Sequence, residues 1–87
     1  MASYRLEISR SAEKQLGRLP GDDKRKIAAA ILSLAEDPRP RGARKLSGYA
    51  DVYRIRIDRY RVLYSVSDKE VVVIVLKLGH RKDVYRD

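Results

Sequence analysis

Cysteine is absent from this 87-residue chain, and histidine occurs only once. The absence of thiols excludes disulfides and Cys-based zinc sites and fits a reducing cytoplasm. With one histidine and no cysteine we expect no metal and no other cofactor. The longest apolar run, Val71–Leu76, is too short to cross a bilayer, and the first residues lack the apolar run of a secretion signal. We therefore expect a soluble, cytoplasmic protein without a membrane partner.

Acidic residues are few relative to basic ones. Lys and Arg number 20 against 12 Asp and Glu, which gives a formal net charge of +8. Such an excess indicates a polyanionic partner, namely nucleic acid, a ribosome or an acidic protein. The length allows one domain, residues 1–87, that buries roughly 60% of its unfolded surface.

Hydrophobic periodicity predicts an α+β fold. Tyr4, Leu6 and Ile8 alternate with polar residues, as in a strand. Ser9 and Asp22 are candidate N-caps of two helices, the first ended by Pro20-Gly21 and the second by Pro38.

A loop at 38–48 precedes expected strands at 52–57, 60–66 and 71–78. We expect a helical hairpin on one face of a four-stranded sheet, completed by a three-stranded antiparallel meander, and a short C-terminal tail or helix. The expected helix-facing side chains of the meander are Tyr53, Ile55, Val62, Tyr64, Val73 and Val75.

Arginines alternate with apolar residues along the first two strands of the meander. If Asp58-Arg59 is the turn, Arg56 lies directly opposite Arg61, and Arg54 lies one diagonal step away. Like charges facing each other across two strands are unfavourable, so this arrangement suggests an anion among the guanidinium groups. The alternative is a solvated hairpin face without a ligand.

The third strand of the meander extends this face. With Ser67 opposite Glu70, the register places Leu76 across from Arg61, and Leu78 and His80 continue on the same side. The arginines and the single histidine are then expected to converge on the sheet face away from the helices. A slip of one residue would separate them.

Two motifs resemble a known family. Tyr-Arg-Val-Leu-Tyr at 60–64 and Gly-His-Arg at 79–81, followed by Val-Tyr-Arg at 84–86, are similar to toxins of the RelE branch of the RelE/ParE superfamily. The resemblance covers nearly the whole chain and is strongest from Lys45 to Arg86. It implies a single RelE-like domain and a small ribonuclease that enters the ribosomal A site and cuts mRNA. It also implies a cognate acidic antitoxin that wraps around the toxin.

The resemblance also assigns roles to residues. The arginine that stabilises the transition state falls on Arg61, the second functional arginine on Arg81, and the C-terminal tyrosine on Tyr85. Arg54 and Arg56 occupy strand positions at which the family often has lysine. The spacing between Arg81 and Tyr85 is shorter than in the best-studied branch.

The proposed chemistry also follows from the residue types. RNA cleavage without a metal needs a base for the ribose 2′-hydroxyl, an acid for the departing 5′-oxygen, and cations for the phosphorane. Arg54, Arg56 and Arg61 suit this last role. Arginine, with a pKa above about 12, is a poor base. This leaves His80 and Tyr85 among the conventional proton-transfer groups. We expect Tyr85 to be the base, assisted by the arginine cluster, and Arg81 to be a phosphate clamp or donor to the leaving oxygen. His80 is an acid, a base or a strand-end residue, and Tyr85 is alternatively an aromatic cover for the sheet or a base-stacking group.

Three classes of function compete. The first is a ribosome-dependent mRNA endoribonuclease toxin, in which Arg41, Arg44 and Lys45, together with Arg39, contact the backbone of ribosomal RNA or are merely solvated. The second is a ParE-like topoisomerase inhibitor with the same fold and a similar antitoxin. The third is a non-catalytic RNA- or ribosome-binding module.

Overall fold

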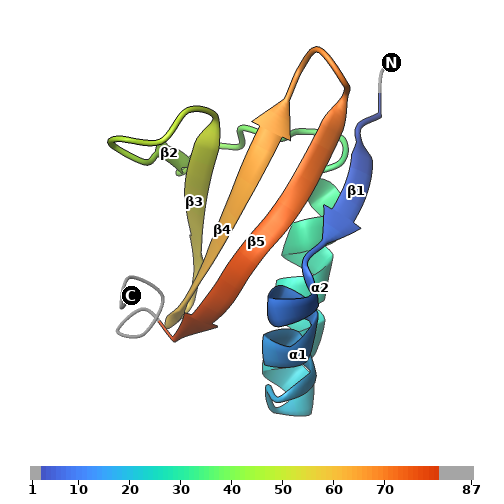
Figure 1. Cartoon of the computed structure of the whole chain (residues 1–87). Coiled ribbons are helices and arrows are strands. Elements are labelled where there is room, and N and C mark those ends of the chain that lie inside the picture. The colour runs from blue at the N-terminus through green and yellow to red at the C-terminus, as the bar shows by residue number, and fades with distance from the viewer. Residues whose placement is uncertain (1–2, 81–87) are drawn as a thin grey trace.

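A computed structural model describes residues 3–80 of the chain. Its elements are, in order, β1 (Arg5–Ile8), α1 (Arg10–Gly17), α2 (Gly21–Ser33), β2 (Arg44–Lys45), β3 (Val52–Ile57), β4 (Tyr60–Ser67) and β5 (Val72–His80) (Figure 1). The α+β class and the helical hairpin are confirmed. The expected C-terminal tail or helix lies outside the described residues. Neither helix of the described part is long and apolar enough to cross a membrane.

The sheet has five strands in the order β1-β5-β4-β3-β2, so the expected count of four was wrong. β1 runs parallel to β5, and the other neighbours are antiparallel. The missed strand is β2, which pairs with β3 through Arg44 opposite Arg54 and Lys45 opposite Tyr53. Two residues are too few to show a period-two pattern, and they fall within the range 38–48 that the sequence predicted to be a loop.

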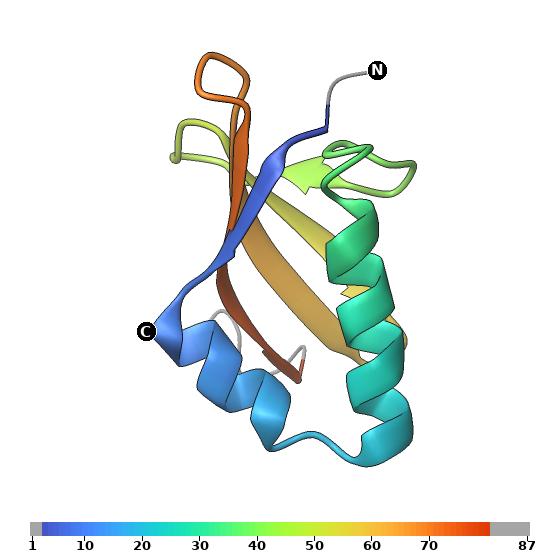
Figure 2. The same ribbon diagram turned by 90° about the vertical axis from the view of Figure 1, so that its right-hand side faces the viewer.

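Both helices cover one face of the sheet (Figure 2). Ala12 of α1 and Ile27 and Ile31 of α2 are buried against it. Five of the six expected helix-facing side chains of the meander belong to the buried core, and the sixth, Tyr53, packs against that core half-buried. The opposite face of the sheet carries neither α1 nor α2.

The two helices begin differently. Ser9 caps α1 as expected, because its Oγ accepts a hydrogen bond of 3.0 Å from the N–H of Ala12. The expected cap of α2 at Asp22 was wrong. This helix begins two residues earlier than that cap implies, at Gly21, with Pro20 at the N-cap and no side-chain cap. Asp22 lies in the first turn, where a carboxylate favours the positive end of the helix dipole, and it accepts a hydrogen bond from Arg25.

The expected register of β4 with β5 was also wrong, for two reasons. The turn between these strands spans residues 68–71, so Ser67 lies opposite Val72 and not Glu70. A β-bulge at Leu76 then inserts one further residue, because Leu63 pairs with Lys77 while Tyr64 pairs with Val75. Together these shifts move every later residue of β5 relative to Arg61 of β4.

Candidate functional site

Cationic side chains form two rows on the sheet face away from the helices. In the first row, Arg44 of β2 lies opposite Arg54 of β3, Arg54 lies opposite Leu63 of β4, and Leu63 lies opposite Lys77 of β5. Residues that pair directly across strands present their side chains to the same face. The row therefore places three cations from three different strands on one surface.

The second row lies two residues further along β3. Arg56 is directly opposite Arg61, as the sequence predicted, and Arg61 is opposite Gly79 of β5. Gly79 has no side chain to cover Arg61, and the Nε atom of Arg61 is buried within this face. The five cations Arg44, Arg54, Arg56, Arg61 and Lys77 are called the arginine face below.

Arg54 is the most deeply buried charged residue of the described chain. Its exposed fraction is 8%, and no other charged residue between 3 and 80 belongs to the buried set. Neither Arg54 nor Arg44 takes part in any of the four ion pairs among described residues, which are Arg5–Glu7, Arg25–Asp22, Lys26–Asp58 and Arg39–Asp68. A buried charge without an opposite charge costs stability, so this position suits a group that binds an anion.

A hollow of about 540 Å³ opens beside Arg54. Arg41, Arg44 and Arg56 also line it, together with Gly42 and Ile55. Gly42 has a φ of 93°, a conformation that glycine adopts at little cost, and it turns the loop so that Arg41 reaches the hollow. The sequence named all four arginines but did not predict that the loop and β3 share one concave surface.

The loop that carries Arg41 is held in place by Arg39. The Arg39 guanidinium donates two hydrogen bonds to the Asp68 carboxylate, of 3.1 and 2.9 Å, and a third of 3.0 Å to the hydroxyl of Tyr53. Its Cζ lies 5.2 Å from the centre of the Tyr53 ring. The Arg39 guanidinium therefore stabilises the fold through Asp68 and Tyr53. This geometry does not support its expected contact with RNA backbone.

The same loop is tied to two further tyrosines. Tyr64, which is buried, donates a hydrogen bond of 2.7 Å to the carbonyl of Pro38, and burial raises the pKa of Tyr64 to about 12. Tyr4 donates one of 2.6 Å to Asp68. The hydrogen bonds from Arg39 and then Tyr4 lower the pKa of Asp68 below its ordinary value. These groups form a clamp between the N-terminal segment, the loop after α2 and the β4–β5 turn.

The expected position of His80 on the arginine face was wrong. His80 pairs with Tyr60, whose side chain is buried on the helix-facing side, and the two rings meet edge to face with centroids 6.3 Å apart. The Tyr60 hydroxyl donates a hydrogen bond of 2.7 Å to Asp23 of α2, which raises the pKa of Tyr60. The bulge at Leu76 accounts for this reversal of side, because the longer turn shifts the pairing by two residues and leaves each side chain on the same face.

The same bulge brings Lys77 onto the arginine face, where the sequence had placed leucines. A charged residue in an otherwise apolar strand was the available signal for this position. Lys45 lies on the other side from Arg44, because it pairs with Tyr53. Arg81 and Tyr85, expected to complete the site, lie outside the described residues.

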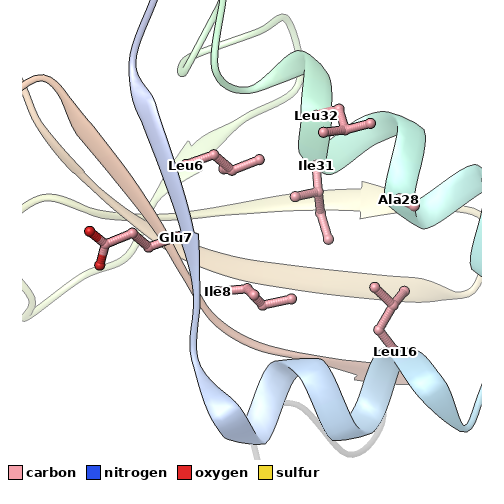
Figure 3. A pocket seen from close by; sticks show the side chains of 7 residues that line it. All are labelled: Leu6, Glu7, Ile8, Leu16, Ala28, Ile31 and Leu32. Carbon is pink, nitrogen blue, oxygen red and sulfur yellow. The ribbon is translucent and has the colours of Figure 1, made fainter.

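A second hollow, of about 250 Å³, lies between β1 and the two helices (Figure 3). Its lining is almost entirely aliphatic, with Leu6, Ile8, Leu16 and Ile31 around it, and the carboxylate of Glu7 points away from these side chains. Glu7 is moreover paired with Arg5 at 2.9 Å. This hollow has no group suited to phosphate chemistry. No group of three or more metal-ligating side chains gathers anywhere within residues 3–80.

Comparison with known proteins places the chain in a family. Residues 6–85 match the family model described as the ParE toxin of the type II toxin-antitoxin system parDE. The mRNA interferase toxin RelE of Escherichia coli is 32% identical over 89 residues, spanning 98% of this chain and 93% of that protein.

Solved structures give the same result. In the archaeal RelE–RelB complex from Pyrococcus horikoshii, the matched chain is 36% identical with a TM-score of 0.82, covering 94% of this chain and 99% of that one. In the intact E. coli RelBE toxin–antitoxin complex, the values are 30% and 0.79, covering 90% and 96%. The chain therefore belongs to the RelE/ParE superfamily of type II toxin–antitoxin toxins and is RelE-like.

Proposed function

We propose that this protein is a cytoplasmic, ribosome-dependent mRNA endoribonuclease that needs no metal ion. The observation that carries the proposal is the arginine face, in which Arg56 lies opposite Arg61 and Arg44 lies opposite the buried Arg54. Folding tolerates such a cluster of like charges more readily when an anion lies among them. The E. coli relative is named an mRNA interferase, which supports the same activity for this chain.

The proposed reaction is an internal transfer at phosphorus. The ribose 2′-oxygen attacks the adjacent phosphorus as its proton leaves to a base, and the P–O bond to the 5′-oxygen breaks as that oxygen gains a proton. The products carry a 2′,3′-cyclic phosphate and a 5′-hydroxyl. Arg61 and Arg56, which lie opposite each other, stabilise the additional charge on the phosphorane, because donors fixed in place before the reaction act on charge as it develops.

The proton-transfer groups are proposed from residue chemistry. Tyr85 is the base and Arg81 the donor or clamp at the leaving oxygen, as the resemblance implies. Lys77 is a second candidate base, since lysine serves as a general base in enzymes and this one lies on the arginine face. No proton-transfer role is proposed for His80, because its ring lies against Tyr60 on the helix side.

We also propose that an acidic antitoxin binds and neutralises the protein. The solved relatives from P. horikoshii and E. coli are complexes with RelB. The net charge of +8 favours a partner of opposite sign, and the arginine face is where such a partner would block RNA. Failure of the product of the neighbouring gene either to bind the toxin or to restore growth would contradict this part of the proposal.

Pulse labelling after induced expression separates the proposed activity from topoisomerase inhibition. Incorporation of labelled amino acids should stop promptly, whereas incorporation of labelled thymidine should continue at first. The reverse order would indicate a ParE-like inhibitor. Arrest of translation without any cleaved mRNA would indicate a module that only binds the ribosome.

A further inference from the structure

The hollow beside Arg54 has more cationic groups than one phosphate requires. In the proposed function, the phosphate that is cut lies at the second row of the arginine face, where Arg56 is opposite Arg61. The first row begins two residues earlier on β3, a step of about 6.7 Å. The hollow beside this row is lined by β2 and by the loop at Arg41, and Arg61 is not part of its lining.

Arg54 gives the clearest sign that this hollow binds a ligand. Its side chain lines the hollow with 8% of its surface exposed, and neither it nor Arg44 opposite has an ion-pair partner among the described residues. One guanidinium group can bind two oxygens of a phosphate at the same time, through two parallel N–H donors. The hollow therefore offers a planar donor from β3 at its base and donors from β2 and the loop at its rim.

The rim is fixed in position. Arg39 anchors the start of the loop through Asp68 and Tyr53, and the N–H of Ala43 donates a hydrogen bond of 3.0 Å to the carbonyl of Pro40. Arg41 lies inside that tight turn, and Arg44 follows on β2. An anion that enters the hollow thus meets donors that are already placed, which lowers the entropy cost of binding.

We propose that this hollow binds a phosphodiester of the substrate RNA that flanks the one being cut. The inference rests on the proposed ribonuclease function. Its consequence is that the protein binds single-stranded RNA at two phosphates. Arg56 lies between the two positions, since it lines the hollow and also faces Arg61. Arg41, Arg44 and Arg54 are then substrate-binding residues that set the path of the strand.

The first test measures binding alone. The probe is a fluorescent single-stranded oligoribonucleotide with a 2′-deoxy sugar at the cleaved position, so that it cannot be cut, and its anisotropy is followed over a range of salt concentrations. For Arg44→Gln we expect binding about 10-fold weaker or more, from loss of a hydrogen bond to a charged group. The slope of log affinity against log salt should fall by about 0.7 for one lost phosphate contact. Arg18→Gln, at the far end of α1, removes the same charge and should match the wild type.

The second test removes the charge from the RNA. Neutral methylphosphonate linkages replace, one at a time, the phosphates on either side of the cut. One of these two substituted linkages should weaken binding to the wild-type protein about as much as Arg44→Gln weakens binding to the unmodified RNA. The same linkage should cause little further loss of affinity in the Arg44→Gln variant. If neither linkage matters, or if the losses add in full, the hollow does not bind a flanking phosphate of the substrate.

A third comparison separates ribosomal RNA from the substrate as the source of the phosphate. Weaker binding of Arg44→Gln to ribosomes, with unchanged binding to the oligoribonucleotide, would overturn the proposal. Absence of cleaved mRNA with the wild-type protein would refute the ribonuclease function instead, and the anisotropy measurement would still report on the hollow.

Discussion

At the scale of single residues, Arg54 illustrates how a binding site differs from the rest of a protein surface. A guanidinium with 8% of its residue exposed, set opposite Arg44, contributes unfavourably to folding. The methylene stem packs well in such a position, but the charge remains without an opposite charge from residues 3–80. Its presence is therefore better explained by a ligand than by stability.

This reading predicts that Arg54→Met makes the protein more stable and less active. Methionine keeps much of the length of the side chain and removes the buried charge, so the free energy of unfolding should rise by about 1 kcal/mol or more. Affinity for a short oligoribonucleotide should fall by about 10-fold or more. Urea denaturation and fluorescence anisotropy measure the two changes. A variant that loses stability and keeps its affinity would assign Arg54 to the core.

His80 is the residue for which sequence and structure disagree most. Because its ring meets Tyr60 on the helix side, we expect His80→Phe to preserve this edge-to-face contact and to keep RNA cleavage within a few-fold of wild type. Growth arrest at equal expression and the yield of cleaved mRNA measure the outcome. An inactive but folded His80→Phe variant would restore the histidine to the proton-transfer step.

At the scale of elements, β5 determines which side chains join the site. The bulge at Leu76 is held by Ser9, whose hydroxyl donates a hydrogen bond of 2.8 Å to the Leu76 carbonyl while also capping α1. The run from Val71 to Leu78 has no glycine or proline to mark a bulge, so periodicity alone gave the wrong register. In the preceding hairpin, the Asp58-Arg59 turn is short, and the predicted pairing of Arg56 with Arg61 was confirmed.

The double role of Ser9 predicts a clear loss of stability in Ser9→Ala. Both the cap of α1 and the anchor of the bulge disappear, so the free energy of unfolding should fall by about 1–2 kcal/mol in urea denaturation. Ser11→Ala is the matched control, since Ser11 is exposed within the same helix and should change stability by less than about 0.5 kcal/mol. Equal stabilities of the two variants would contradict the anchoring role.

The clamp around Asp68 predicts a pH dependence. The pKa of this carboxyl is lower in the folded protein than in the unfolded chain, so its ionised form stabilises the fold above about pH 4, and this contribution is lost as the pH falls through the lowered pKa. The melting temperature of Asp68→Asn should therefore lie below wild type at pH 7, and the gap should close toward pH 2. Asp51→Asn, which alters an exposed carboxylate outside the ion pairs, should show a small gap at every pH. A gap for Asp68→Asn that is independent of pH would contradict the assignment.

At the scale of the whole molecule, the sequence predicted the layers and the core, because both depend on periodicity over many residues. It also predicted the arginine hairpin, where one turn fixes the register. It did not predict β2 or the positions of Lys77 and His80, because these depend on a two-residue pairing and on one inserted residue. The helices pack against one face of the sheet (Figure 2), and the arginine face lies on the other.

The most direct test maps the 5′ ends of translated mRNA at single-nucleotide resolution, with the wild-type protein, Arg61→Ala and the surface control Arg18→Ala. We predict new 5′-hydroxyl ends within ribosome-bound codons for the wild type and for Arg18→Ala. For Arg61→Ala the rate of their appearance should fall by about 10²–10³, as expected for loss of one donor to the phosphorane. Wild-type protein that yields no new ends, or a folded Arg61→Ala variant that yields as many, would contradict the role given to the arginine face.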